Sequence, residues 1–193
     1  MKKTTFYLLL IATILTVAII GCGKDDLDGN LSTISAENVD VGDYHIATVK
    51  ATINDDFEVA SNKFQNNGFT LKLKKVPEEY LFFANSGLWE DIPLDIISDK
   101  NGKLTFLSIL GYNNSGDYEI GFSLEDSNNG IVAFYVYADR KFSIQGKGRY
   151  NTYTCSFKKG WNIVYWGGGG ERVTTNKPSN SNFKWYCSSL GWS

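Results

Sequence analysis

The chain has 193 residues, a formal net charge of −2 and 42% hydrophobic residues, enough for one domain with a buried core. Its three arginines, Arg140, Arg149 and Arg172, form no basic stripe, so the composition argues against a nucleic-acid-binding protein. His45 is the single histidine, which leaves no second imidazole for a metal site and no motif for histidine-based catalysis.

The N-terminus follows the plan of a signal peptide over residues 1–21. Two lysines near the start precede an apolar run over 6–20, which is shorter than the roughly 20 residues of a spanning helix. The run ends at Ile19-Ile20-Gly21-Cys22, which resembles the lipobox of bacterial lipoproteins. This resemblance implies cleavage before Cys22, diacylglycerol and palmitate on that cysteine, and a membrane anchor made of lipid. The alternative is an uncleaved anchor helix, and both place the rest of the chain outside the cytoplasm.

We interpret residues 22–43 as a lipidated flexible tether, because they are acidic, lack aromatic residues and show no helix or strand period. Gly23-Lys24-Asp25-Asp26 is similar to the surface-export signal of Bacteroidetes lipoproteins. It favours an outer-membrane protein that faces the cell exterior, while a solvated acidic tether on a periplasm-facing anchor is the alternative. We expect residues 44–193 to form a single domain.

From residue 44 on, short β-type runs alternate with clusters of Asn, Asp and Gly. Strands are predicted at 45–54, 68–75, 104–112, 118–125, 130–138, 141–148, 153–158, 161–166, 172–175 and 183–187. Apolar and polar residues alternate over 69–74, as in a strand with one side on a core. The only helical turn expected is at 77–81, where Pro77 suits a first turn. This pattern predicts an all-β fold, an antiparallel β-sandwich (Ig-like or similar), with a barrel as second choice.

Cys155 and Cys187 remain in the mature chain once Cys22 is lipidated. In an oxidising compartment they could form a disulfide, and two buried thiols that never meet are the alternative. The sequence does not show whether their Cα atoms lie within about 7 Å of each other, so the bridge stays open.

Candidate catalytic and metal sites are weak throughout the chain. Adjacent carboxylates such as Glu78-Glu79 are typical of solvated turns, although a glycosidase also uses two carboxylates. Asp126, Asn128 and Asn129 are the nearest approach to a Ca²⁺ loop, and they lack the EF-hand spacing. We therefore expect a protein that is not an enzyme and that holds no metal or cofactor.

Aromatic residues are concentrated in the last third of the chain, around a tetraglycine at 167–170. If Trp161 and Tyr165 face a core, then Trp166 points the other way, where an indole could stack on a sugar ring or a partner side chain. Trp166, Trp185 and Tyr186 are the candidate ligand contacts. The alternative is that these rings fill the core.

Tyr137-Ala138-Asp139-Arg140, together with segments 157–165 and 174–186, resembles a family of small lipoproteins from Bacteroidales bacteria. The similarity covers roughly residues 46–187. The family has no established biochemical activity, so the resemblance implies a cell-envelope β-sandwich lipoprotein and carries over no catalytic residue.

These observations lead to two functional hypotheses. The first is a surface-exposed, non-enzymatic binding or accessory module for an extracellular glycan or protein. The alternative is a structural component of a cell-surface complex, such as a fimbria-like subunit, joined by strand addition at an exposed edge. A hydrolase would need a cleft with convergent titratable groups.

Overall fold

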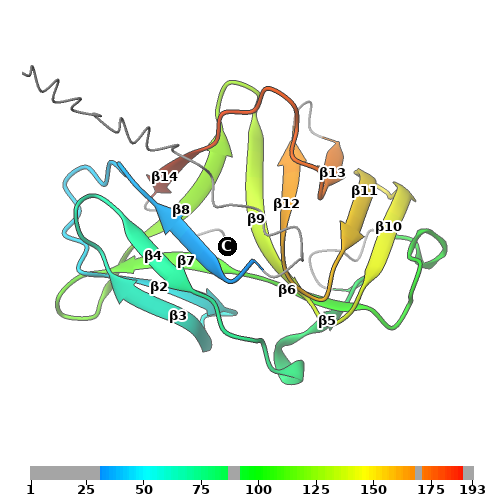
Figure 1. Cartoon of the computed structure of the whole chain (residues 1–193), viewed down its shortest axis with the longest axis horizontal. Helices are drawn as coiled ribbons and strands as arrows, with labels where there is room; N and C mark the ends of the chain where they lie inside the picture. The colour runs from blue at the N-terminus through cyan, green and yellow to red at the C-terminus, as the bar shows by residue number, and fades with distance from the viewer. Residues whose placement is uncertain (1–30, 87–91, 168–170, 189–193) are drawn as a thin grey trace, which may run out of the picture.

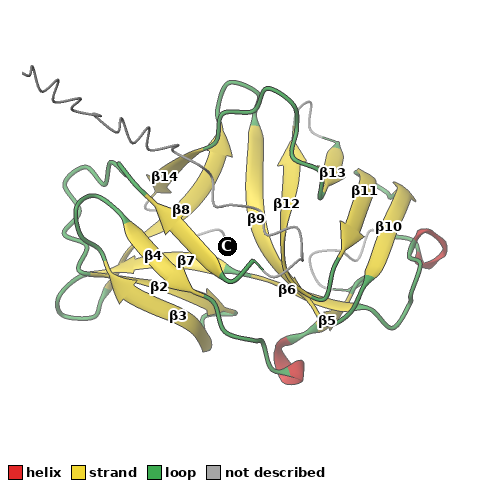
Figure 2. Ribbon diagram, in the orientation of Figure 1, coloured by secondary structure: helices red, strands yellow, loops and turns green. Residues whose placement is uncertain are grey.

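The structure is a computed structural model, and it describes residues 31–86, 92–167 and 171–188. The predicted signal peptide and Cys22 lie outside these residues. The described strands are β1 (Thr33–Ala36), β2 (Thr48–Ile53), β3 (Phe57–Lys63), β4 (Phe69–Lys72), β5 (Phe82–Phe83), β6 (Lys103–Phe106), β7 (Ser108–Tyr112), β8 (Tyr118–Asp126), β9 (Ile131–Ala138), β10 (Phe142–Lys147), β11 (Thr152–Phe157), β12 (Gly160–Gly167), β13 (Arg172–Thr174) and β14 (Lys184–Ser188). Short 3₁₀ turns occur at η1 (Glu78–Tyr80) and η3 (Leu94–Ile96), as Figure 2 shows. The predicted all-β class is confirmed, and the turn expected near Pro77 is η1.

Most strands belong to one large sheet in the order β10-β11-β13-β12-β9-β8-β7-β2-β3. β14 pairs with β8, β6 pairs with β9, and β5 pairs with β6. Strands β1 and β4 form a separate two-stranded sheet. Within the described residues the pairs are antiparallel, except that β11 and β13 run parallel. Figure 1 shows β2, β3 and β7 on one side of the molecule and β10 and β11 on the other, with β9 and β12 between them.

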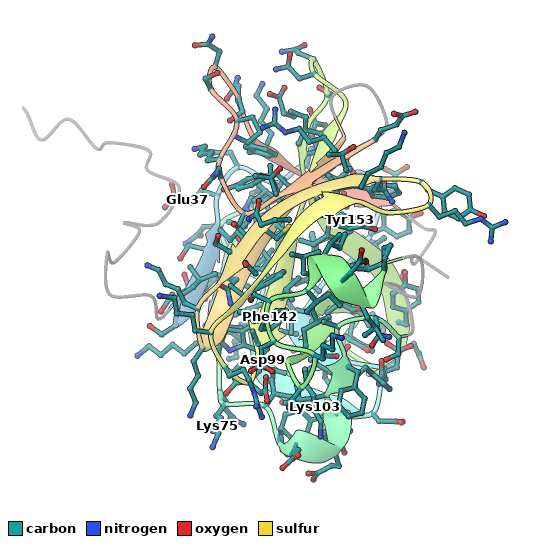
Figure 3. All side chains as sticks on the ribbon, turned by 90° about the vertical axis from the view of Figure 1, so that its right-hand side faces the viewer. Glu37, Lys75, Asp99, Lys103, Phe142 and Tyr153 are labelled. Atoms are coloured by element: carbon teal, nitrogen blue, oxygen red, sulfur yellow. The ribbon has the colours of Figure 1, made fainter. Side chains whose placement is uncertain are left out.

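Two hydrophobic cores lie on opposite faces of this sheet. The first core lies between the β1–β4 pair and the strands β2, β3, β7, β8, β9 and β12. The second core lies between β9 to β13 and the segment around η3, which contributes Ile97. Figure 3 shows Phe142 and Tyr153 on the side of β10 and β11 that faces this segment. Sheet faces that bury apolar side chains against other strands are consistent with the predicted β-sandwich.

Strand β9 is shared by both cores. Tyr135 and Tyr137 lie in the first core, whereas Val136 and Ala138 lie in the second core. Successive side chains of a strand point to opposite faces, so a strand that is buried on both sides needs apolar residues at every position. This arrangement explains why the sequence of β9 is hydrophobic throughout.

The predicted start of the domain at Tyr44 is wrong, because residues 31–43 take part in the fold. β1 pairs with β4 in register from Thr33↔Lys72 to Ala36↔Phe69. Ile34 is 1% exposed and belongs to the first core, as does Val39. The tether prediction failed here because β1 is only four residues long and offers just two inward-facing apolar side chains. Any tether after Cys22 ends before β1.

Candidate functional site

Trp166 lies near the end of β12 and is 41% exposed. Its neighbour Tyr165 is buried in the first core together with Trp161. Trp166 faces the other side of the sheet, where it stands opposite Val132 of β9 and Val173 of β13 in register. The alternation of β12 therefore places the indole at the open margin of the second core.

The indole of Trp166 is held in place by the turn between β10 and β11. Its Nε1 donates a hydrogen bond to Asn151 Oδ1 at 3.2 Å. The Asn151 amide in turn donates to the Tyr153 hydroxyl at 3.4 Å, and the Asn151 carbonyl accepts a bond from the Gly148 N–H at 2.8 Å. Asn151 thus fixes both the turn and the orientation of the exposed ring.

Two further rings extend this surface. The Phe134 ring on β9 lies 6.2 Å from the Trp166 ring between centroids, with an interplanar angle of 37°. Tyr150, at the tip of the β10–β11 turn, is 64% exposed, and the Arg149 guanidinium lies over its ring at 5.0 Å. We call Phe134, Arg149, Tyr150, Asn151 and Trp166 the Trp166 surface. It offers aromatic faces together with an amide and a cation, groups that recognise sugars and amphipathic partners.

Trp185 and Tyr186 lie apart from this surface. Trp185 stacks on Tyr135 at 6.3 Å with an interplanar angle of 5°, and its Nε1 donates to the Ser35 carbonyl at 3.2 Å. Since Tyr135 and Phe134 are successive residues of β9, Trp185 and Trp166 lie on opposite faces of the sheet. Trp185 packs against the first core and joins β14 to β1, which is a structural role, and its part in ligand contact stays a prediction from the sequence.

Tyr186 is 37% exposed, and its hydroxyl lies 3.1 Å from the Ser127 hydroxyl in the turn between β8 and β9. It remains available to solvent, but it is carried by β14 and is separate from the Trp166 surface. Sequence reasoning missed Tyr150 and Asn151. The signal was present, because residues 149–152 lie between the predicted strands 141–148 and 153–158, and an aromatic residue in a hairpin turn is commonly exposed.

Both described cysteines carry free thiols, so the disulfide that the sequence left open is not formed. Cys155 is completely buried in the second core, and its Sγ donates to the Val173 carbonyl at 3.5 Å. Burial raises the pKa of this thiol to about 12. Cys187 packs against the first core, donates to the Asp40 carbonyl at 3.0 Å and also has a pKa raised by burial.

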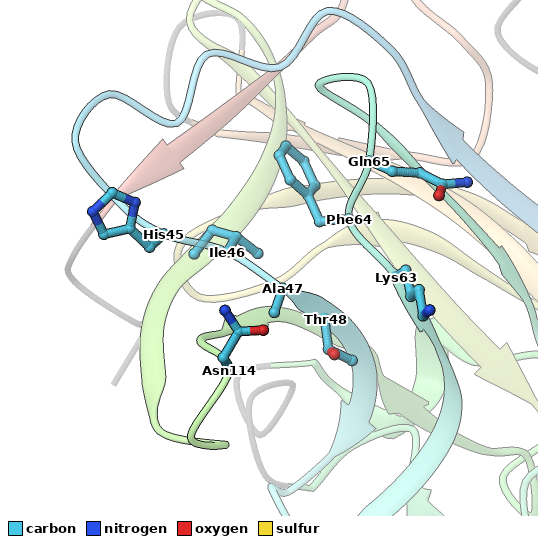
Figure 4. A pocket seen from close by; sticks show the side chains of 8 residues that line it. All are labelled: His45, Ile46, Ala47, Thr48, Lys63, Phe64, Gln65 and Asn114. Carbon is cyan, nitrogen blue, oxygen red and sulfur yellow. The ribbon is translucent and has the colours of Figure 1, made fainter.

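His45 lies at the rim of an open hollow of about 520 Å³ (Figure 4). The hollow is lined by His45, Ile46, Ala47, Thr48, Lys63, Phe64, Gln65 and Asn114. None of these side chains is a carboxylate or a thiol, and Lys63 lies across the hollow from His45 in Figure 4. Of these lining side chains, those that carry an ionisable group are His45 and Lys63.

Asp126, in the segment that comes nearest to a Ca²⁺ loop in the sequence, is held by hydrogen bonds from Asn129 and Asn182. Asp126 Oδ2 accepts from the Asn129 side-chain amide at 2.7 Å and from the Asn182 backbone N–H at 3.0 Å. The bond from Asn129 is the main reason why the pKa of Asp126 lies below its ordinary value. In the described part of the chain, no three His, Cys, Asp or Glu side chains are grouped so as to hold a metal ion.

Comparisons with known proteins give no relative: no family model matches the sequence, and no curated protein or solved structure does. No helix among residues 31–86, 92–167 and 171–188 is long and apolar enough to cross a membrane. The resemblance to Bacteroidales lipoproteins stays a prediction from the sequence.

Proposed function

We propose that this protein is an outer-membrane lipoprotein, anchored through Cys22 and facing the cell exterior, whose β-sandwich is a non-enzymatic binding module for an extracellular glycan or protein. The Trp166 surface is its contact site. The observation that carries this proposal is an exposed indole whose orientation is fixed by Asn151, next to the still more exposed ring of Tyr150.

The physical argument concerns the cost of keeping an indole in water. A tryptophan side chain that is two-fifths exposed leaves apolar area unburied, which a ligand can cover. The hydrogen bond to Asn151 satisfies the indole N–H and restricts the ring, so binding loses little side-chain entropy. The residues that contribute most of the binding energy of an interface are commonly aromatic side chains surrounded by polar groups.

The test is a glycan array and a cell-envelope pull-down with the full chain, expressed with its own N-terminus and purified in mild detergent. We expect a hit whose affinity falls by at least about tenfold in Trp166→Ala. Tyr118→Ala is the matched control, because Tyr118 is 43% exposed on β8 and lies outside the Trp166 surface. A hit that Trp166→Ala binds as well as the unaltered chain contradicts the site, and the absence of any hit contradicts the function.

The alternative of an assembly component is favoured by one observation. In the described part of the chain β14 pairs with β8 on one side only, so it offers an edge for strand addition. The end strand β10 is less open, because Ile97 forms a bridge with Ile144 there. Capture of a polymeric envelope protein, lost when Tyr186 on β14 is replaced by proline and kept in Trp166→Ala, would establish this role instead.

A further inference from the structure

The hollow beside His45 is formed by three segments that are far apart in the sequence (Figure 4). Residues 45–48 lead into β2, residues 63–65 lie at the end of β3, and Asn114 lies in the turn between β7 and β8. Figure 1 shows these strands on the side of the molecule opposite to β10 and β11, so the hollow is separate from the Trp166 surface. Its volume of about 520 Å³ lies within the range of small-molecule sites.

The walls of this hollow are fixed by backbone hydrogen bonds. The Ala47 N–H donates to the Tyr112 carbonyl at 2.8 Å, and the Ala47 carbonyl accepts from the Phe64 N–H at 3.0 Å, which joins the segments to one another. Gln65 and Gly68 exchange two backbone bonds of 3.0 Å and so close the hairpin beside the hollow. A backbone that is bonded in this way needs little rearrangement when a ligand enters, which lowers the entropic cost of binding.

Three polar side chains of the lining have no role in the fold. Lys63, Gln65 and Asn114 are exposed, and among the described residues their side chains make no ion pair or hydrogen bond. The neighbouring Asn113 provides a contrast, because its side-chain amide donates to the Glu119 carboxylate at 2.8 Å and braces the turn. The fold thus accounts for Asn113, whereas the side chain of Asn114 is available to a ligand.

The charge of the lining favours a ligand with one negative group. Lys63 is the only lysine or arginine of the lining, and none of the lining side chains is a carboxylate. An ammonium group without an ion pair attracts an anion, whereas the bidentate recognition of phosphate is typical of arginine. The amides of Gln65 and Asn114 and the Thr48 hydroxyl donate and accept hydrogen bonds, as the hydroxyl groups of a sugar do.

Phe64 gives the hollow an apolar floor. Its ring packs against the first core and lies 6.1 Å from the Phe122 ring between centroids, with an interplanar angle of 27°. Ile46 also lines the hollow and packs against the same core. An aromatic ring offers an apolar face to the C–H groups of a sugar. The combination of this floor with polar walls favours a sugar over a small inorganic anion.

We propose that this hollow binds an acidic sugar, a ring that carries several hydroxyl groups and one carboxylate. Lys63 pairs with the carboxylate, Gln65 and Asn114 bond to the hydroxyl groups, and the sugar ring packs on Phe64. His45 lies across the hollow from Lys63 (Figure 4) and offers a further hydrogen-bonding group. This site does not rest on the function proposed above.

The test measures the affinity of the full chain, in mild detergent, for glucuronic acid and N-acetylneuraminic acid by saturation-transfer NMR. The methyl ester of each acid is the matched neutral ligand. We expect at least one acid to bind, at least about fivefold more tightly than its ester. Lys63→Gln should lose about fivefold in affinity for that acid, and Lys63→Gln combined with Asn114→Ala about tenfold. The matched control Lys72→Gln changes an exposed lysine on β4, outside the hollow, and should keep the affinity.

The other outcomes overturn the proposal. If an ester binds as tightly as its acid, the carboxylate is not recognised. If Lys63→Gln binds as tightly as the unaltered chain, or Lys72→Gln loses as much affinity as Lys63→Gln, the acid does not bind in the hollow. If neither acid binds, the hollow is not a site for an acidic sugar. Trp166→Ala should retain the binding, and a loss in that variant would place the acid on the Trp166 surface instead.

Discussion

Replacing Ile34 by alanine tests whether the segment before Tyr44 belongs to the folded domain. Ile34 is 1% exposed and lies in the first core, on the β1 strand that pairs with β4. If the segment were a tether, its side chains would not affect folding. If it is part of the core, the substitution leaves a cavity beneath β1.

The expected cost follows from the size of the deleted side chain. Truncation of a buried isoleucine to alanine costs about 2–5 kcal/mol, depending on how far the site collapses. β1 belongs to a two-stranded sheet with one partner strand, so partial collapse is easy and we expect about 3 kcal/mol. In a domain of this size that free energy corresponds to a decrease in Tm of roughly 6–12 °C.

The measurement is denaturant and thermal unfolding followed by tryptophan fluorescence, with Ser35→Ala as the control. The Ser35 side chain is exposed, and its hydroxyl makes a 3.3 Å contact with the Thr70 hydroxyl at the surface, so this variant should lose less than about 0.5 kcal/mol. A loss in Ile34→Ala no larger than in the control would refute the packing of β1 and restore the tether.

Two further predictions concern the other core and the end of β12. Gly167→Ala should destabilise the fold more than Gly116→Ala. Both glycines have positive φ, at +127° and +86°, so alanine is strained at either position. A Cβ on Gly167 would also collide with the Gly130 carbonyl, whereas the space around Gly116 is open. Equal Tm losses in the two variants would contradict the close crossing of β12 and the β8–β9 turn. Burial raises the pKa of the Cys155 thiol from 9.0 to about 12, so the thiol loses its proton at lower pH in the unfolded chain than in the folded chain. The contribution of the protonated thiol to stability is therefore complete below pH 9 and is lost as pH rises toward 12. Urea unfolding between pH 8 and 10.5 should therefore show a shallower alkaline decline in Cys155→Ala than in the unaltered chain, and parallel profiles would refute the burial of this thiol.

Local patterns in the sequence predicted the central strands well. β8, β9 and β12 were expected at 118–125, 130–138 and 161–166, and each lies within one residue of those bounds. Alternating side chains and Asn- or Gly-rich turns specify such strands through near neighbours alone. Features that depend on distant partners were not visible, such as the parallel pairing of β11 with β13.

The missed strand β3 shows how an irregular ladder hides a strand. A register shift between Ala51 and Thr52 lets Ala51 pair with Ala60 and Thr52 pair with Glu58. Val59 is the extra residue of this bulge, and both Val59 and Ala60 are buried. Two successive inward-facing residues break the alternation on which strand prediction relies, so the sequence of β3 resembled a loop.

The candidate site, like the strands, was predictable where it depends on local alternation and not where it depends on distant residues. The period of β12 alone places Trp166 opposite Trp161 and Tyr165, so its exposed position follows from the sequence. The structural role of Trp185 does not, because its partners Tyr135 and Ser35 lie far away along the chain. Whether Cys155 and Cys187 form a disulfide was not predictable either, because it depends on the core in which each thiol lies, and the two thiols lie in different cores.

Because β1 belongs to the fold, the tether between a lipid anchor at Cys22 and the domain is short. If Cys22 carries the lipid, residues 23–32 separate the membrane anchor from β1, which begins at Thr33. Even fully extended, this stretch reaches about 35 Å, similar to the thickness of the hydrocarbon layer below it. The domain would then stay close to the lipid headgroups. It would contact proteins in the same membrane and polymers that extend to the cell surface, and it would not extend far into the surrounding medium.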